Sequence, residues 1–111
     1  MPDFHPEAIV GTWTCRLWNT RHTITFAKDY TFKGICLVGD KITDRYEGEF
    51  RLVDPYVGMD ELVWKYVKSN TIPAGTVDRD KVEILNDKLL VVWTKNGLRI
   101  AYQKVLPATK K

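Results

Sequence analysis

The sequence contains little cysteine and almost no serine. Cys15 and Cys36 are its two cysteines, and they form no Cys-x-x-Cys motif of the kind used for zinc or redox chemistry. Ser69 is the sole serine, so the Gly-x-Ser-x-Gly elbow of serine hydrolases is absent. With two thiols and no secretory signal at the start of the sequence, we expect a reducing compartment and a cytoplasmic location.

Long apolar runs and a strong charge of one sign are also missing. No segment approaches the ~20 consecutive apolar residues of a membrane-spanning helix, so no membrane span is expected. The 17 Lys and Arg residues and 14 Asp and Glu residues give a net charge of only +3. Without a clustered basic face, this charge argues against nucleic acid as a partner.

Candidate catalytic groups are few. His5 lies near the start of the chain, which leaves His22 as the one central imidazole. Asp78 and Asp80 place two carboxylates on one face at the rim of a strand, where such pairs are usually solvated rather than used for acid–base work. We therefore expect no enzyme, no metal and no cofactor.

The sequence is rich in aromatic residues and in alternation. Hydrophobic residues make up 44% of the 111 residues and aromatic residues 12%, enough to build a core. Short runs alternate apolar and polar residues between turn signals, which is typical of all-β proteins. We expect a single domain over residues 1–111, with its core at about 8–106 and a helical turn at 6–9. The expected strands are 10–18, 21–27, 30–38, 45–53, 61–68, 79–85, 88–94 and 98–105.

Turn residues predict the register of four hairpins, with turns at Asn19-Thr20, 27–29, Asn86-Asp87 and Asn96-Gly97. In this register one face is apolar and the other charged. A closed sheet leaves no edge strand with unpaired backbone groups, so we predict an eight-stranded antiparallel up-and-down barrel. Cys15 and Cys36 then lie too far apart for a shared metal or a disulfide. The predicted pairs are Trp13 with Phe26, Cys15 with Ile24, Leu17 with His22, Phe26 with Tyr30, Ile24 with Phe32, Ile84 with Leu89, Val82 with Val91, Trp93 with Ile100 and Val91 with Tyr102.

The first strand opens with "GTW", Gly11 to Trp13. At the start of an eight-strand meander, this pattern resembles the Gly-x-Trp signature of the lipocalins and their calycin relatives. The resemblance implies a lipocalin-like barrel whose closed end is plugged by Trp13, with a basic residue late in the last strand lying across the ring. Lys104 has that position here, where the family commonly uses arginine, and a cation over an indole contributes about 0.5–2 kcal/mol. Gly11 would let the chain pass close to the barrel floor.

The opposite, open end of the barrel is the expected site, because it receives the longer connections at 39–44 and 69–78. We predict non-catalytic binding of a small apolar or aromatic ligand there, with His22, Tyr46 and Tyr66 as polar handles. The same rings could instead fill the barrel completely, so a ligand pocket and a filled core both stay open as hypotheses. The predicted ligand-binding residues are Leu17, His22, Cys36, Tyr46, Tyr66, Trp93 and Ile100.

The alternative hypothesis is a protein-binding module or inhibitor that acts through exposed loops. Trp18 falls on the outward face beside the open end, and other apolar residues lie in the connections at 54–60 and 69–78. Aromatic and methionine side chains in such positions are typical interface anchors. The predicted interface residues are Trp18, Tyr56, Met59, Ile72 and Pro73. We expect a monomer or a weak homodimer.

Overall fold

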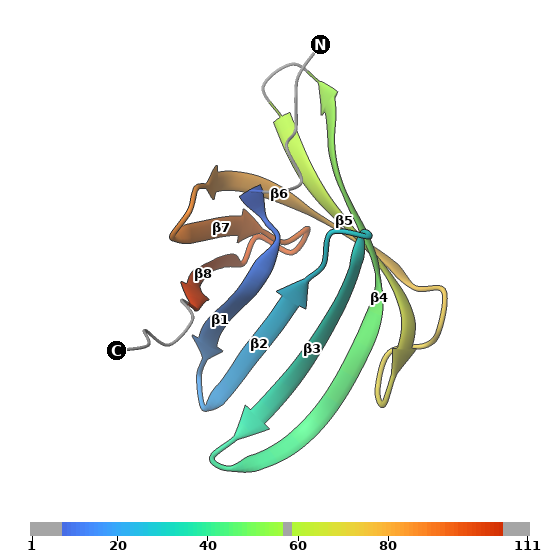
Figure 1. Ribbon diagram of the computed structural model, residues 1–111, viewed down its shortest axis with the longest axis vertical. Coiled ribbons are helices and arrows are strands. Elements are labelled where there is room, and N and C mark those ends of the chain that lie inside the picture. The colour runs from blue at the N-terminus through green and yellow to red at the C-terminus, as the bar shows by residue number, and fades with distance from the viewer. Residues whose placement is uncertain (1–7, 57–58, 106–111) are drawn as a thin grey trace.

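Eight antiparallel strands close into one barrel. The computed structural model describes residues 8–56 and 59–105. Each strand pairs with the next in sequence, and β8 returns to β1, so the predicted all-β up-and-down barrel is confirmed (Figure 1). The strands are β1 (Gly11–Leu17), β2 (Thr20–Phe26), β3 (Thr31–Val38), β4 (Lys41–Tyr56), β5 (Met59–Ser69), β6 (Val77–Leu85), β7 (Leu89–Trp93) and β8 (Arg99–Val105).

The described part of the chain contains no helical element. The helical turn predicted at 6–9 is therefore unsupported, and residues 6 and 7 lie outside the described residues. The roomy connection predicted at 39–44 is also wrong, because β4 begins at Lys41 and Val38 pairs with Lys41. Gly39 takes the positive φ of 62° that this tight turn requires.

The first hairpin differs from its predicted register by two residues. Trp18 and Asn19 form the turn, one position earlier than predicted, and Trp18 adopts a φ of 56°. Trp13 consequently pairs with Ile24 rather than with Phe26. Because side chains alternate with a period of two, a shift of two residues leaves each one on its predicted face.

The second hairpin shifts by two residues as well, and it moves Tyr30 out of the barrel wall. Phe26 pairs with Phe32, so the chain turns over residues 27–30. Tyr30 lies in this turn with a φ of 68° and is 49% exposed, contrary to its predicted inward position. Asp29 stabilises the turn, since its Oδ1 accepts hydrogen bonds from N and Oγ1 of Thr31 at 3.2 and 2.6 Å.

The last two hairpins change the face of β7. A register irregularity between Val82 and Ile84 interrupts the pairing of β6 with β7, and Trp93 pairs with Arg99 rather than Ile100. This is a one-residue slip, which turns every side chain of β7 to the opposite face. Leu90 and Val92 therefore join the core, and Trp93 points outward. The turn is a five-residue connection in which Thr94 N donates to Leu98 O at 2.9 Å.

Aromatic rings fill the middle of the barrel. Phe26 packs edge-on against Phe50 with ring centroids 4.8 Å apart, and Phe32 packs edge-on against Trp64 at 5.1 Å. Such pairs contribute about 0.5–1.5 kcal/mol each beyond the area they bury. These rings are at most 4% exposed.

Lys104 and Trp13 pack together at the join between β1 and β8. Nζ of Lys104 lies 4.8 Å from the centroid of the Trp13 ring and donates to the Val10 carbonyl oxygen at 2.9 Å. The predicted contact between cation and indole is therefore present. Trp13 Nε1 donates to the Ile9 carbonyl at 2.8 Å. A Cβ on Gly11 would lie 2.6 Å from Cε of Lys104, so glycine makes room for the lysine stem.

Candidate functional site

A cavity of about 510 Å³ lies at the end of the barrel where the β5–β6 and β7–β8 connections meet. Its volume is within the ~300–1,000 Å³ range of small-molecule sites. Six of the seven predicted ligand-binding residues line it: Leu17, His22, Cys36, Tyr46, Tyr66 and Ile100. Six of the residues predicted to lie together at the open end therefore share one cavity, and Trp93 is the exception.

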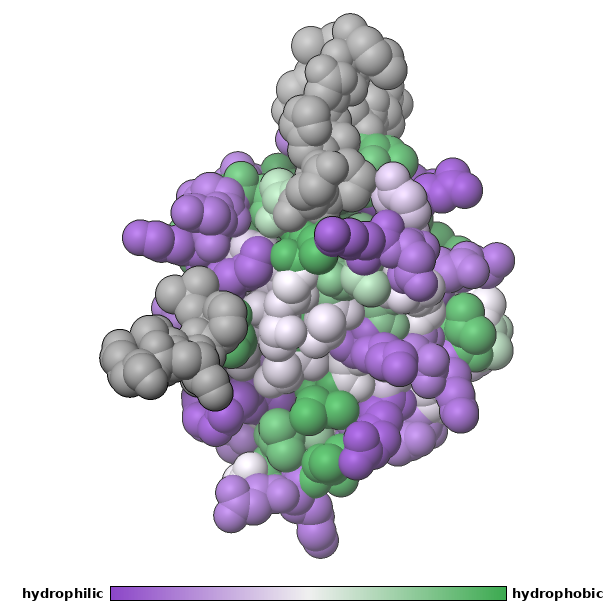
Figure 2. All heavy atoms as spheres, viewed as in Figure 1, coloured by the Kyte–Doolittle hydropathy of each residue, from purple (hydrophilic) through white to green (hydrophobic). Residues whose placement is uncertain are grey.

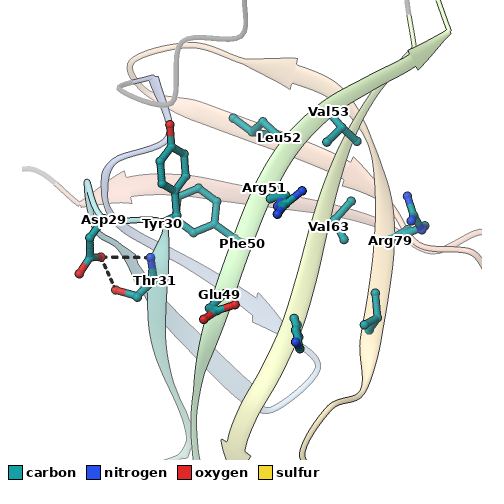
Figure 3. A pocket seen from close by; sticks show the side chains of 12 residues that line it. Asp29, Tyr30, Thr31, Glu49, Phe50, Arg51, Leu52, Val53, Val63 and Arg79 are labelled. Carbon is teal, nitrogen blue, oxygen red and sulfur yellow. Dashed lines mark hydrogen bonds between the residues drawn. The ribbon is translucent and has the colours of Figure 1, made fainter.

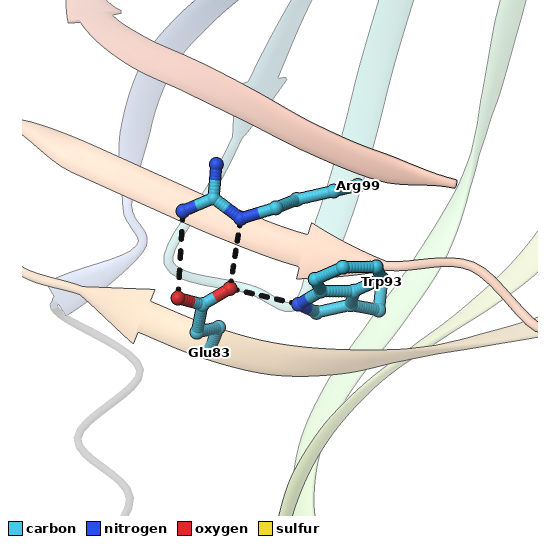
Figure 4. Close-up of polar contacts among 3 residues, drawn as sticks. All are labelled: Glu83, Trp93 and Arg99. Atoms are coloured by element: carbon cyan, nitrogen blue, oxygen red, sulfur yellow. Dashed lines mark hydrogen bonds and ion pairs between the residues drawn. The ribbon is translucent and has the colours of Figure 1, made fainter. Parts of the chain in front are cut away.

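Trp93 belongs to the outer surface. Its Nε1 donates to Oε1 of Glu83 at 2.7 Å, and Arg99 contacts the same carboxylate through Nε at 3.0 Å (Figure 4). Trp93 is 40% exposed. The prediction that it lines the ligand site is wrong because the five-residue β7–β8 connection reversed the face of β7.

One row of polar side chains crosses four neighbouring strands on the inner face. Cys15 pairs with His22, His22 with Cys36, and Cys36 with Asp44. The predicted separation of the two cysteines into different rows is wrong, because the first and the second hairpin are each shifted by two residues. Sγ of Cys36 lies 3.2 Å from Nδ1 of His22, within hydrogen-bond distance.

Both members of this cysteine–histidine pair are held in their neutral forms. Burial lowers the pKa of His22, and burial together with the nearby Asp44 carboxylate raises the pKa of Cys36. Burial, reinforced by Cys36, also raises the pKa of Cys15 to about 11. A cysteine nucleophile needs the opposite shift, toward the thiolate. Among the described residues, no group of three His, Cys, Asp or Glu side chains is placed to hold a metal ion.

Asp44 fastens the β5–β6 connection over the mouth of the cavity. The carboxylate is 8% exposed, and it accepts hydrogen bonds from Thr71 Oγ1 at 2.8 Å and from Asn70 N at 3.1 Å. Ser69 Oγ donates to Oδ2 of Asp44, the oxygen that Thr71 also contacts, at 3.5 Å, and it accepts from Ile72 N at 3.0 Å. These bonds set Ile72 into the wall of the cavity. Sequence reasoning missed Asp44, whose signal is a lone acidic residue in the row of Cys36.

Asp80 and Trp64 form the opposite wall. Trp64 Nε1 donates to Oδ2 of Asp80 at 3.0 Å. Burial raises the pKa of Asp80, the Trp64 hydrogen bond lowers it and the Asp78 carboxylate raises it, and the net result is a pKa of about 6. Asp80 is therefore ionised at neutral pH in a setting that disfavours its charge.

Tyr46, Tyr66 and Tyr102 are the tyrosines that line the cavity among the described residues. Tyr46 and Tyr66 pack edge-on with ring centroids 5.9 Å apart. Burial raises the pKa of both, so both remain neutral hydroxyls able to donate or accept a hydrogen bond. The ring of Tyr46 lies across the neighbouring strand, where a Cβ on Gly34 would come within 2.2 Å of Cε1. Glycine at position 34 therefore decides where Tyr46 can lie.

A second hollow lies on the outside of the barrel. It has a volume of about 760 Å³ and runs over β4, β5 and β6 beside the β2–β3 turn (Figure 3). Glu49, Arg51, Val63 and Arg79 point into it with mixed charge, and Arg79 is already paired with Glu61 at 3.2 Å. It is a groove on a charged sheet face, and it lacks the converging buried polar groups of the cavity at the open end.

The predicted interface residues do not share one surface. Trp18 is 85% exposed at the β1–β2 turn, and Pro73 is exposed, whereas Ile72 lines the cavity. The side chains of Tyr56 and Met59 lie outside the described residues. Hydrophilic residues dominate the edge of the face in Figure 2, and hydrophobic residues gather toward its lower part, the region of the β3–β4 hairpin in Figure 1.

The comparisons with known proteins identify no family for this chain. No family model, curated protein or solved structure matches the chain. The closed eight-stranded barrel is shown by the structure itself, and the lipocalin resemblance stays a prediction. Among the described residues, none forms a helix with the length and apolar character needed to span a membrane.

Proposed function

We propose that this protein binds a small apolar or aromatic ligand, without catalysis, in the open-end cavity of a lipocalin-like barrel. The observation that carries the proposal is a cavity of about 510 Å³ whose apolar and aromatic side chains come mainly from the strands, with polar and charged side chains making up the rest of its lining. That combination is the usual chemistry of small-molecule sites. The "GTW" opening and the closed meander support the lipocalin-like description.

The chemistry of the polar groups supports binding rather than catalysis. His22 and Cys36 are both shifted toward their neutral forms, and the tyrosine hydroxyls are shifted away from ionisation. Such groups orient a ligand through hydrogen bonds but supply no activated nucleophile. Cys15 and Cys36 are free thiols, which supports a reducing location, and we include the cytoplasm in the proposal.

Binding of N-phenyl-1-naphthylamine, a neutral apolar aromatic dye, tests the proposal by fluorescence titration. Leu17→Trp places a large ring at the lining of the cavity, whereas Ile42→Trp makes the same kind of change on an exposed side chain of β4. We expect Leu17→Trp to weaken dye affinity about tenfold, or about 1.4 kcal/mol, and Ile42→Trp to leave it unchanged. Equal affinities for the two variants, or no dye binding by the wild type, would count against the cavity.

One observation favours the alternative, a protein-binding module: Trp18 is 85% exposed beside the same end of the barrel. A large ring in water is a frequent interface anchor. On this alternative, Trp18→Ala abolishes capture of a partner protein while melting temperature and dye affinity stay at wild-type values. Loss of stability in Trp18→Ala would instead show that the ring packs on the barrel.

A further inference from the structure

The carboxylates of the cavity wall point to the charge of the ligand. Asp78 and Asp80 occupy alternate positions of β6 and both line the cavity. Two basic residues, Arg79 and Lys95, also line the cavity. The Arg79 guanidinium pairs with Glu61 and its side chain is 60% exposed, and Lys95 is exposed on the β7–β8 connection. Together with Asp44, the lining therefore has three carboxylates against two basic groups, and both basic groups are exposed.

The three acidic residues of the cavity are not equivalent. Asp44 is occupied by hydrogen bonds from the β5–β6 connection. Asp80 receives one hydrogen bond, from Trp64 to Oδ2, and no other donor to it is found among the described residues. Its second oxygen is therefore the acceptor that a ligand can reach, in surroundings that make an unpaired carboxylate unfavourable.

The Tyr46 hydroxyl is a second polar group that a ligand can reach. Tyr46 lines the cavity and is 9% exposed as a residue, and its hydroxyl takes part in no hydrogen bond among the described residues. No buried side-chain oxygen among those residues lacks a partner, so this hydroxyl is accessible rather than sealed in the core. It can donate a hydrogen bond to a ligand or accept one.

We propose that the ligand of this cavity is a small aromatic molecule with a basic nitrogen, whose ammonium group is held by Asp80. This inference rests on the proposed function and adds the ligand class. The ammonium donates to the free carboxylate oxygen, and the aromatic part packs among Tyr46, Tyr66 and Trp64. Cations are attracted to ring faces as well as to carboxylates. An anionic ligand of the same shape is repelled by Asp78 and Asp80.

Three indoles of similar shape and different charge test the proposal by isothermal titration calorimetry at pH 7.5. Tryptamine is the cation, 3-ethylindole is the neutral analogue that lacks the amine, and indole-3-acetate is the anion. We expect tryptamine to bind about tenfold more tightly than 3-ethylindole, a difference expected for one charge-assisted hydrogen bond. Indole-3-acetate should bind most weakly.

Three variants then assign the preference to the residues named. Asp80→Asn keeps an acceptor for Trp64 but removes the charge, and should reduce tryptamine to the affinity of 3-ethylindole. Asp87→Asn makes the same change at an exposed position of the β6–β7 turn and should leave the preference intact. Tyr46→Phe removes only the hydroxyl and should weaken tryptamine severalfold without affecting 3-ethylindole. Circular dichroism checks that each variant is folded.

The outcomes separate this inference from the proposed function. Tryptamine binding no more tightly than 3-ethylindole, including no binding of either, overturns the amine proposal. A tryptamine preference that survives Asp80→Asn overturns the role of Asp80. Neither result touches the proposed function, which fails only if N-phenyl-1-naphthylamine does not bind in the cavity.

Discussion

Asp80 holds a charge that its surroundings do not favour. In the unfolded chain its pKa is the ordinary 3.8, and in the folded protein burial raises that pKa to about 6. The folded state therefore holds a proton that the unfolded state has lost between about pH 4 and pH 6. The stability contributed by this group is fully present below about pH 4 and is lost as the pH rises to about 6. The groups beside it are Asp78, Trp64, Tyr66 and Tyr102.

This linkage predicts that Asp80→Asn stabilises the protein at neutral pH. Asparagine is uncharged and still accepts the Trp64 hydrogen bond. We expect a gain of about 1 kcal/mol at pH 7.5, after allowing for solvent screening, and about 4 °C in melting temperature. At pH 4 the two proteins should melt together, because Asp80 is then protonated when folded. Thermal unfolding followed by circular dichroism at both pH values measures this difference, and a variant less stable than wild type at pH 7.5 contradicts it.

At the scale of elements, the β5–β6 connection depends on a single carboxylate from another hairpin. Asp44 accepts bonds from Asn70 and Thr71, and Ser69 extends the set to Ile72. Buried carboxylates with charge-assisted bonds of this kind are costly to remove. The position of this connection, and with it the mouth of the cavity, is thus set by β4 as well as by its own sequence.

Asp44→Ala should therefore loosen this connection before the barrel unfolds. We expect faster amide hydrogen exchange at Asn70 and Ile72, with unchanged protection in β2, because local opening draws on contacts of the loop alone. Hydrogen exchange measured by NMR gives the result residue by residue. Asp40→Ala, at an exposed turn position, is the matched control and should change neither region. Unchanged exchange in Asp44→Ala would show that the loop is held by other contacts.

The strands and most inward faces could be predicted from the sequence, but the registers could not. A period of two identifies which side chains share a face, yet it does not distinguish a pairing from one shifted by two residues. For this reason Trp13 and Ile24 were assigned to the correct face with the wrong partners. The two-residue shifts of the first and second hairpins together hid the row that joins Cys15, His22 and Cys36.

Two local features could not be predicted from the alternation of apolar and polar residues. The run "LLVVW" of β7 has no polar residue to mark its phase, so the five-residue turn that follows decided the face of Trp93. In β4, a register irregularity separates the pair of Cys36 with Asp44 from that of Leu37 with Ile42. The role of Asp44 depends on that irregularity and on a loop 25 residues away, neither of which a local pattern contains.

At the scale of the whole molecule, the barrel is closed by a short seam. Only three residue pairs join β1 to β8 among the described residues, and one of them is Trp13 with Lys104. The same lysine supplies the cation over the indole and a hydrogen bond to Val10. One side chain therefore makes two of the contacts across the seam.

Replacing Lys104 should weaken the whole barrel. We expect Lys104→Ala to lower the free energy of unfolding by about 1–3 kcal/mol, because it removes a cation–π contact and a hydrogen bond to a part-buried carbonyl. Lys104→Arg retains the charge and the donors and should lose less than half as much. Urea denaturation followed by tryptophan fluorescence gives both values. Equal losses for alanine and arginine would show that the shape of the stem matters and the cation does not.

The seam also has a consequence for how the protein is made. The bond from Lys104 to Val10 joins residues 94 positions apart, so β1, the earliest strand of the barrel in the sequence, receives its second neighbour from β8, the latest. Pairings this distant in sequence slow folding, since a long loop must close before the contacts stabilise it. Until β8 arrives, the free edge of β1 is open to strands of other chains. We expect newly made and truncated chains, rather than the finished barrel, to be the species that aggregate.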